Sequence, residues 1–306
     1  MRFRATIDNV PTFLRVAQAI EKLQKQYIIT LTPSQMKIIC NDDTNDGGIQ
    51  VWSVIKVDSI FSDYRIMSNS KNEITMRLSA DALISVLRSG SLSSGGLASS
   101  GQSSQESAEE EVVVVKLAKK GDEPVLSFEF NLSSRVGEKH RVTHDVKIEL
   151  LKKTEVERLS EPMCPEPDVH VLLPSLQKIR TIVDRLKPMS NILAIKANNN
   201  KHLQLSIRTD NVNCETLWTN CANPNMRQHE EHEELEEPEE EVDPNKMFTV
   251  TVPIKGFLKF LNSHVVSTNT IACICHRHCL ILYVYIGALN DAGGVLTYYI
   301  PTIIDE

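Results

Sequence analysis

The stretch RFRATIDNVPTFLRVAQAIEKLQKQYIITLT, residues 2–32, contains three elements of different periodicity. Apolar and polar residues alternate from Arg2 to Ile7, as in a strand with one buried face. From Val10 to Gln26, apolar residues return every three or four positions, as in a helix that packs on a sheet. The β-branched and aromatic run Tyr27–Thr32 then predicts a second strand. The order strand, helix, strand indicates an α+β fold.

The same order of elements recurs in both halves of the chain. In the first half, further strands are predicted at 35–40, 49–55, 60–67, 73–77, 112–118, 125–130 and 142–151, with a second helix at Ser79–Ser89. In the second half, strands are predicted at 168–173, 192–197, 202–208, 213–218, 247–252, 270–275, 279–286 and 295–300, with helices at Pro174–Lys187 and Pro253–His264. We therefore predict two duplicated domains, each with antiparallel sheets and two helices.

The predicted domains comprise residues 1–151 and 168–306, joined by an extended connector at 152–167 that contains three prolines. Two segments of strongly biased amino-acid composition should not pack into the core of either domain. We expect a mobile Ser/Gly/Glu insertion at 89–111 and an acidic, disordered insertion at 223–245.

The charge of the chain depends on where the carboxylates lie. The net charge of −7 argues against a nucleic-acid partner. However, residues 227–243 hold nine Glu, one Asp and one Arg, a local net of −9, so the rest of the chain carries +2. Without the four glutamates at 106–111 the remainder is +6. The segments that should fold are therefore mildly basic.

Composition indicates an ordinary globular protein. Apolar residues make up 41% and charged residues 24%. No apolar run approaches the ~18 residues that a membrane span needs, and no signal sequence is evident. Seven unevenly spaced cysteines do not suggest a secreted disulfide framework, so we expect an intracellular protein with reduced thiols.

Three of the four predicted helices have an outward face rich in cations and poor in carboxylates. In the first helix, Phe13, Val16 and Ile20 form the apolar stripe. A single such helix means little, but its repetition predicts a surface for backbone phosphates without sequence reading. The predicted DNA-facing residues are Arg15, Lys22, Lys25, Arg88, Lys178, Arg185, Lys255 and Lys259.

The clearest candidate for a metal site is the group Cys273, Cys275, His276, His278 and Cys279. Its spacing is not that of paired zinc ligands, because the two histidines fall where a hairpin should turn. We therefore interpret these residues as buried or turn residues. The common phosphate-binding and nucleophile-elbow motifs are absent. We expect no catalytic residue, no cofactor and no metal, and hence no enzyme.

Several motifs resemble those of the sliding clamps, and within them the hydroxyurea-sensitive (Hus) checkpoint clamp subunits. The resemblance spans nearly the whole chain. Its markers are Met1-Arg-Phe-Arg-Ala5, Gln50-Val-Trp52, Asn72-Glu-Ile74, Val142-Thr-His-Asp145, Glu161-Pro162, Pro165-Glu-Pro-Asp-Val169 and Leu172-Leu-Pro174.

The resemblance implies a fold like that of proliferating-cell nuclear antigen, with helices on the channel side of a ring. It further implies a nuclear heterotrimer with two other clamp-like subunits, encircling double-stranded DNA. An ATP-dependent loader would place the ring, which would serve a damage-sensing kinase and repair enzymes.

Clamp subunits join by strand addition at exposed sheet edges. That mode of assembly predicts interface residues on the strands at 142–151 and 213–218. They are Val146, Ile148, Leu150, Glu215 and Leu217.

Two alternatives stay open at this point. The chain could form a homotrimeric replication clamp, or it could be a metal-dependent nuclease on a β-rich frame.

Overall fold

The computed structural model describes residues 1–41, 48–94, 113–133, 139–225, 243–267, 269–289 and 291–303. Most of the two expected insertions lies outside these residues. The chain divides into two compact units. The first comprises 1–40, 51–161 and 290–295, and the second comprises 41–50, 162–289 and 296–306. The boundary at Glu161 falls inside the expected connector, and no helix among the described residues is suited to cross a membrane.

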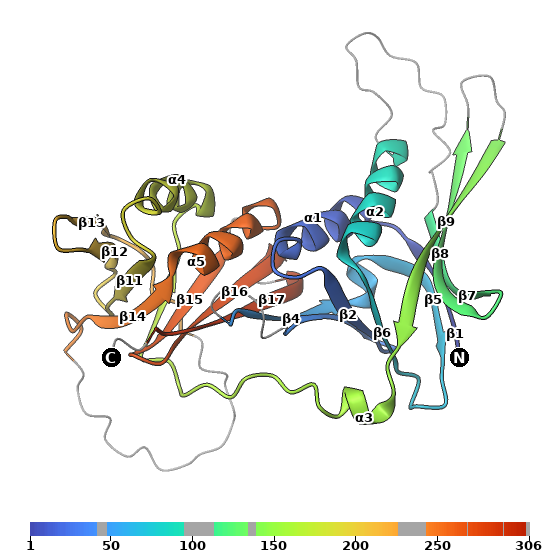
Figure 1. The fold of residues 1–306 in the computed structure, drawn as a ribbon, viewed down its shortest axis with the longest axis horizontal. Helices are drawn as coiled ribbons and strands as arrows, with labels where there is room; N and C mark the ends of the chain where they lie inside the picture. Colours follow the sequence, from blue (N-terminus) through green and yellow to red (C-terminus); the bar gives the residue numbers. More distant parts are fainter. Residues whose placement is uncertain are drawn as a thin grey trace, which may run out of the picture. The chain divides into compact units, whose positions relative to one another are not determined.

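The first unit is built from antiparallel strands with two helices on one face (Figure 1). Its strands follow one another as β4-β3-β2-β6-β9-β8-β7-β1-β5. Its elements are β1 (Arg2–Ile7), α1 (Val10–Ile20), β2 (Gln26–Leu31), β3 (Gln35–Cys40), β4 (Gln50–Lys56), η1 (Val57–Ser59), β5 (Phe61–Met67), β6 (Ile74–Ser79), α2 (Ala80–Ser94), β7 (Val113–Lys120), β8 (Glu123–Ser133), β9 (Lys139–Leu150) and α3 (Lys153–Val156).

Helix α1 begins where the sequence predicts and ends six residues earlier than expected. Asn9 Oδ1 accepts a hydrogen bond from the Thr12 N–H at 3.0 Å, which satisfies one free donor of the first turn. At the other end, the N–H of Leu23 donates to the carbonyl of Ile20. This bond spans three residues, as in a 3-10 turn, instead of the four residues of an α-helix. Tyr27, fully buried, then donates from its hydroxyl to the Ala17 carbonyl. The chain must leave the helix early so that β2 can start at Gln26 and place Tyr27 in the core.

Helix α2 continues past the expected end at Ser89 to Ser94. Gly90 lies against β8, where an added Cβ would come within 2.5 Å of the Phe130 ring. A glycine in mid-helix is unfavourable for the isolated helix, but here it permits close packing on the sheet. The packing of Gly90 against Phe130 therefore outweighs the low helix propensity of glycine.

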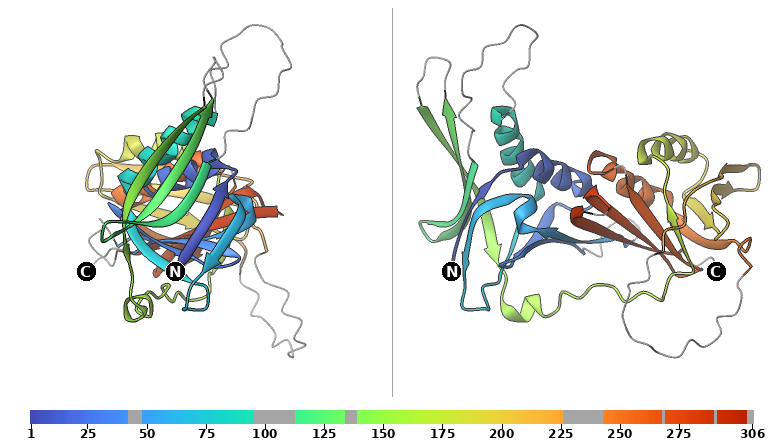
Figure 2. Two further views of the ribbon diagram at one scale, coloured as in Figure 1. Left: turned by 90° about the vertical axis from the view of Figure 1, so that its right-hand side faces the viewer. Right: turned by 180° about the vertical axis from the view of Figure 1, so that it is seen from behind.

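The second unit has the same mix of antiparallel strands and helices on one face (Figures 1 and 2). Its strand orders are β13-β12-β11-β14 and β10-β15-β16-β17, and the first residues of β17 belong to the first unit. Its elements are β10 (Val169–Leu172), α4 (Leu176–Leu186), β11 (Ile192–Ala197), β12 (Leu203–Arg208), β13 (Asn213–Trp218), β14 (Phe248–Pro253), α5 (Ile254–Phe260), η2 (Leu261–Val265), β15 (Thr270–Cys275), β16 (Cys279–Ala288) and β17 (Asp291–Pro301).

The expected helix at Pro253–His264 is two elements, because the chain tightens into a 3-10 turn after Phe260. The expected connector is not wholly extended, since it contains the four-residue helix α3. There the Lys152 N–H donates to Glu155 Oε2 at 2.8 Å, which caps the turn.

An asparagine cluster joins both ends of the acidic segment. Asn198 is 3% exposed, and its carbonyl accepts from Asn223 Nδ2 at 3.1 Å. Asn198 Nδ2 in turn donates to the carbonyl of Asn245 at 3.5 Å. The chain therefore enters and leaves residues 226–242 at one anchored point beside the β11–β12 turn.

The core of the second unit contains a hydroxyl pair that can be tested. Ser263 Oγ and the Tyr298 hydroxyl lie 2.6 Å apart, and both residues are 0% exposed. Tyr298→Phe should lower the free energy of unfolding by about 1–3 kcal/mol, because the Ser263 hydroxyl loses this partner. Urea unfolding measures the change.

Ser263→Ala and the double variant complete this test as a double-mutant cycle. The double variant should lose less stability than the sum of the single variants, because it buries fewer unpaired polar groups. Strict additivity would contradict the pairing.

Candidate nucleic-acid interface

In the first unit, the helices α1 and α2 turn one face to the sheet and the other to solvent. Phe13, Val16 and Ile20 are 0–4% exposed, and Arg15 lies on the opposite side of α1, exposed. The Arg15 guanidinium donates to Thr12 Oγ1 at 3.0 Å, which orients it along the helix. Arg88 is likewise exposed on α2, opposite the buried Leu83 and Leu87. Both arginines keep the outward position that the sequence predicts.

Lys22 and Lys25 lie elsewhere than expected. The sequence predicts them on the outer face of a helix, but α1 ends at Ile20. Both lysines therefore lie in the turn that leads to β2, and both are exposed there. Their DNA-facing role stays a prediction, now for a turn rather than a helix face.

In the second unit, α4 and α5 pack against each other and leave their cations outside. Ile179 and Val183 of α4 are 1% and 0% exposed, whereas Lys178 and Arg185 are exposed. On α5, Lys255 is exposed and Lys259 is half-buried.

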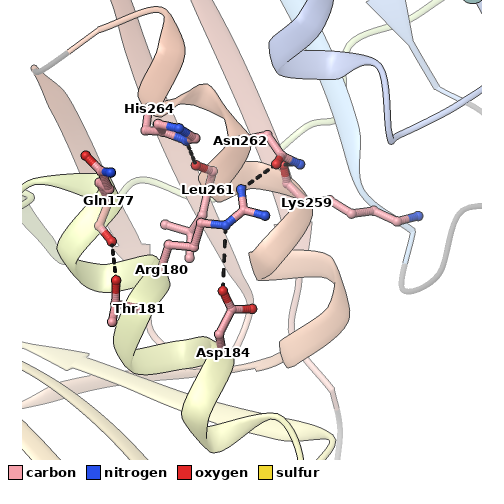
Figure 3. A network of polar contacts seen from close by, with 8 residues as sticks. All are labelled: Gln177, Arg180, Thr181, Asp184, Lys259, Leu261, Asn262 and His264. Atoms are coloured by element: carbon pink, nitrogen blue, oxygen red, sulfur yellow. Dashed lines mark hydrogen bonds and ion pairs between the residues drawn. The ribbon is translucent and has the colours of Figure 1, made fainter.

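Arg180 links α4 to η2 (Figure 3). Its guanidinium donates to Asn262 Oδ1 at 2.5 Å, and its Nε lies 3.7 Å from Asp184 Oδ2. Asn262 also donates from Nδ2 to the Lys259 carbonyl at 2.9 Å. These contacts connect α4 to α5 through Asn262 of η2. Nothing in the sequence pattern indicates them, because Asn262 comes 82 residues after Arg180.

The cations on the outer sides of the helices differ from the cations on the sheet of the first unit in whether a carboxylate pairs with them. On the sheet of the first unit, Glu129 pairs with Lys116 and Arg141, and Asp145 pairs with Lys120. The hydrogen bond from Lys116 is the main cause that lowers the pKa of Glu129. By contrast, no carboxylate of the described residues forms an ion pair with Lys178, Arg185 or Lys255. The charges of these three residues are therefore available to an anionic partner.

Strand β9, on which the sequence predicts the interface residues Val146, Ile148 and Leu150, pairs with a different strand along each of its two parts. Residues 148–150 pair with β6, and residues 139–147 pair with β8. Val146 and Ile148 are 2% and 7% exposed, so their side chains belong to the core of the unit. Each of the three residues pairs with one described strand only, and the interface role of Val146, Ile148 and Leu150 stays a prediction.

On the side that faces β6, strand β9 is open over the residues that precede Ile148, and Val146 is one of them. Because β6 ends at Ser79, no described strand continues along that side of β9 before Lys147. The free backbone edge therefore belongs to the part of β9 that pairs with β8 on its other side.

Strand β13 lies at the edge of its four-stranded sheet and pairs with β12. Glu215 and Leu217 are exposed there, and the Leu217 side chain is 58% exposed. The other outer strand, β14, is covered by backbone bonds from Arg277 and Ile303 to Thr249 and Thr251. A bare strand with an exposed leucine is a suitable template for pairing with another chain, and the interface role of these two residues stays a prediction.

The cysteine and histidine residues of the last hairpin separate into two groups. Cys273, Cys275 and Cys279 are buried, whereas His276 and His278 are exposed in the turn. His276 Nδ1 accepts a hydrogen bond from the Thr249 N–H at 2.9 Å. Within the described parts of the chain, no group of three or more potential ligands is placed to hold a metal ion.

The fold is that of a known clamp. A crystal structure of proliferating cellular nuclear antigen from Entamoeba histolytica matches with a TM-score of 0.67 and 13% identity, over 99% of both chains. The predicted clamp fold is thus confirmed.

Relatives match over the whole chain. Checkpoint protein hus1 of Schizosaccharomyces pombe is 31% identical over 306 residues, 100% of both chains. The Dictyostelium discoideum homolog is 28% identical over 99% of both chains, and checkpoint protein HUS1 of Homo sapiens is 26% identical over 99% of this chain and 100% of its own. The Hus1-like protein family model matches residues 1–304. The chain therefore belongs to the Hus1-like protein family, as its sequence motifs predict.

Proposed function

We propose that this chain is a subunit of a checkpoint clamp that encircles DNA and acts in DNA damage signalling and repair. The observation that carries the proposal is the full-length match to checkpoint proteins, together with a fold that is also found in a sliding clamp. The chain acts as a scaffold rather than a catalyst in this proposal. Its site of action is the nucleus.

The outward cations supply the contact with DNA. Lys178, Arg185 and Lys255 have no carboxylate partner among the described residues, so a phosphate can approach them without first breaking an ion pair. Long lysine and arginine side chains bind phosphate groups without reading bases. Such contacts hold a duplex while allowing the protein to slide along it.

Ring assembly uses two kinds of open sheet edge. β13 presents an unpaired strand edge, and β9 presents one over the part that pairs only with β8. Strand addition between such edges joins chains through main-chain hydrogen bonds. The partners are two other clamp-like chains, and an ATP-dependent loader places the heterotrimer on DNA. Repair enzymes and a damage-sensing kinase then act on the ring as clients.

The DNA contact can be tested by removing unpaired charge. Lys178→Ala, Arg185→Ala and Lys255→Ala together should weaken retention of the assembled ring on circular DNA. The slope of log retention against log salt should become shallower by about 0.9 for each phosphate that the variant no longer binds. A salt titration of ring retention measures both effects.

The control variant replaces three exposed lysines outside helices α1, α2, α4 and α5 with alanine: Lys56, Lys71 and Lys201. It removes the same amount of positive charge as the triple variant but leaves the helix faces intact. Its retention on DNA should therefore stay near that of the unchanged protein. Equal losses in both variants would mean that overall charge, not the helix faces, determines retention.

Assembly can be tested by mass. Alone, the purified chain should not form a trimer, whereas with two other clamp-like chains it should reach the mass of three chains in light scattering. Leu217→Arg should reduce this assembly, because it places a long charged side chain at the β13 edge. Leu289→Arg, at an exposed leucine outside β13, is the matched control. A stable trimer of the chain alone would instead identify a replication-type clamp.

A further inference from the structure

Three cysteines meet on one face of the second unit. Cys275 ends β15 and Cys279 begins β16, and these two residues are direct partners in the antiparallel register. Directly opposite residues of an antiparallel pair lie on the same face, with Cα atoms about 4.5–5.5 Å apart. Disulfides form over Cα separations of about 4.4–6.8 Å. The hairpin thus brings Cys275 and Cys279 to a Cα separation that a disulfide can span.

The third cysteine comes from the segment that leads into β10. Cys164 packs against the buried cluster that contains Cys275 and Cys279. The Cys275 thiol donates to the carbonyl of Pro165 at 3.4 Å, across 110 residues of sequence. The His276 N–H donates to Asp168 Oδ2 at 2.7 Å. These contacts hold the segment 164–168 over the end of the hairpin.

The environment of the three thiols is unequal. Cys275 and Cys279 are 1% and 5% exposed, whereas Cys164 is half-buried. Interaction with Cys275, and then burial, raise the pKa of the Cys279 thiol, while its hydrogen bond with Cys164 lowers it. An oxidant in solution therefore reaches Cys164 first, and Cys279 lies next to it.

We propose that Cys164 and Cys279 form a reversible disulfide under peroxide stress and that this bond ties the connector end at residues 162–167 to strand β16. Cys164 is the sulfur that the oxidant attacks, and Cys279 is the resolving thiol. The direct pair Cys275–Cys279 is disfavoured because both residues belong to a regular sheet, whereas Cys164 lies in a segment without helix or strand structure and can adjust to disulfide geometry.

The reaction takes two steps with hydrogen peroxide as the oxidant. Cys164 first loses its thiol proton, and the resulting thiolate attacks one peroxide oxygen, so an S–O bond forms and the O–O bond breaks. The hydroxide that leaves takes up the released proton and becomes water. The Cys279 sulfur then attacks the sulfenic acid. An S–S bond forms, the S–O bond breaks, and the proton of Cys279 leaves with that oxygen as a second water. The two thiols lose two electrons, and one peroxide gains them.

The covalent bond would replace a few weak contacts as the anchor of the connector end. In the reduced protein this end is held by the Pro165 and Asp168 contacts and by packing of Cys164. Oxidation would therefore slow local opening of residues 162–167 while leaving the fold of the unit unchanged. A cellular thiol such as glutathione would reverse the bond by exchange.

The experiment uses the folded, fully reduced full-length chain exposed to hydrogen peroxide. Free thiols are then blocked under denaturing conditions, and peptides are identified by mass spectrometry. The expected product joins the peptides of Cys164 and Cys279, with the loss of two hydrogen atoms. Amide hydrogen exchange at residues 162–167 should slow in the oxidised protein and recover after reduction.

Single variants distinguish the roles of the three sulfurs. Cys164→Ser should abolish the crosslink and the slowed exchange, whereas Cys279→Ser should leave a sulfenic acid at Cys164 that a dimedone probe traps. Cys275→Ser should still crosslink, and Cys214, half-buried on β13, should stay reduced as an internal control. Absence of the Cys164–Cys279 product in the folded protein, or its formation only in the denatured chain, would overturn the proposal.

Discussion

The structure depends on how each helix divides its surface between the sheet and water. In α1 and α4 the apolar stripe is almost completely buried, which contributes roughly 1.5–3 kcal/mol for each large side chain. Because that burial fixes the rotation of the helix about its axis, the residues on the opposite side must face solvent. Lys178 and Arg185 are therefore exposed as a consequence of burying Ile179 and Val183. The same packing that stabilises the fold thus creates its charged surface.

The sequence predicts the elements well because hydrophobic periodicity reflects burial directly. Strands such as β11, β12 and β13 lie within a residue of their predicted bounds. The errors occur where a tertiary contact outweighs a local signal. The burial of Tyr27 ends α1 early and moves Lys22 and Lys25 into a turn, while Gly90, usually a helix breaker, lies in α2 because Phe130 leaves no room for a larger residue. Such contacts join residues far apart in sequence and leave no periodic trace.

The candidate site likewise combines features that sequence periodicity predicts with features that only tertiary contacts determine. Exposure of the helix cations follows from amphipathicity, so it could be predicted from one sequence. The Arg180–Asn262 contact could not, because it depends on how α4 and η2 pack. For β9, the strand itself is predicted correctly, but alternation alone cannot tell which part of a strand lies beside a second strand. Val146 and Ile148 resemble edge residues in sequence and prove to be core residues in the fold.

The asparagine anchor beside the β11–β12 turn has an entropic consequence. Asn223 and Asn245 both bond to Asn198, so the chain after β13 and the chain before β14 are held at the same place. The entropy of closing a loop between two fixed ends rises only with the logarithm of its length. The free-energy cost of bringing Asn223 and Asn245 together therefore depends only weakly on how many residues separate them. One buried asparagine thus positions the chain both after β13 and before β14.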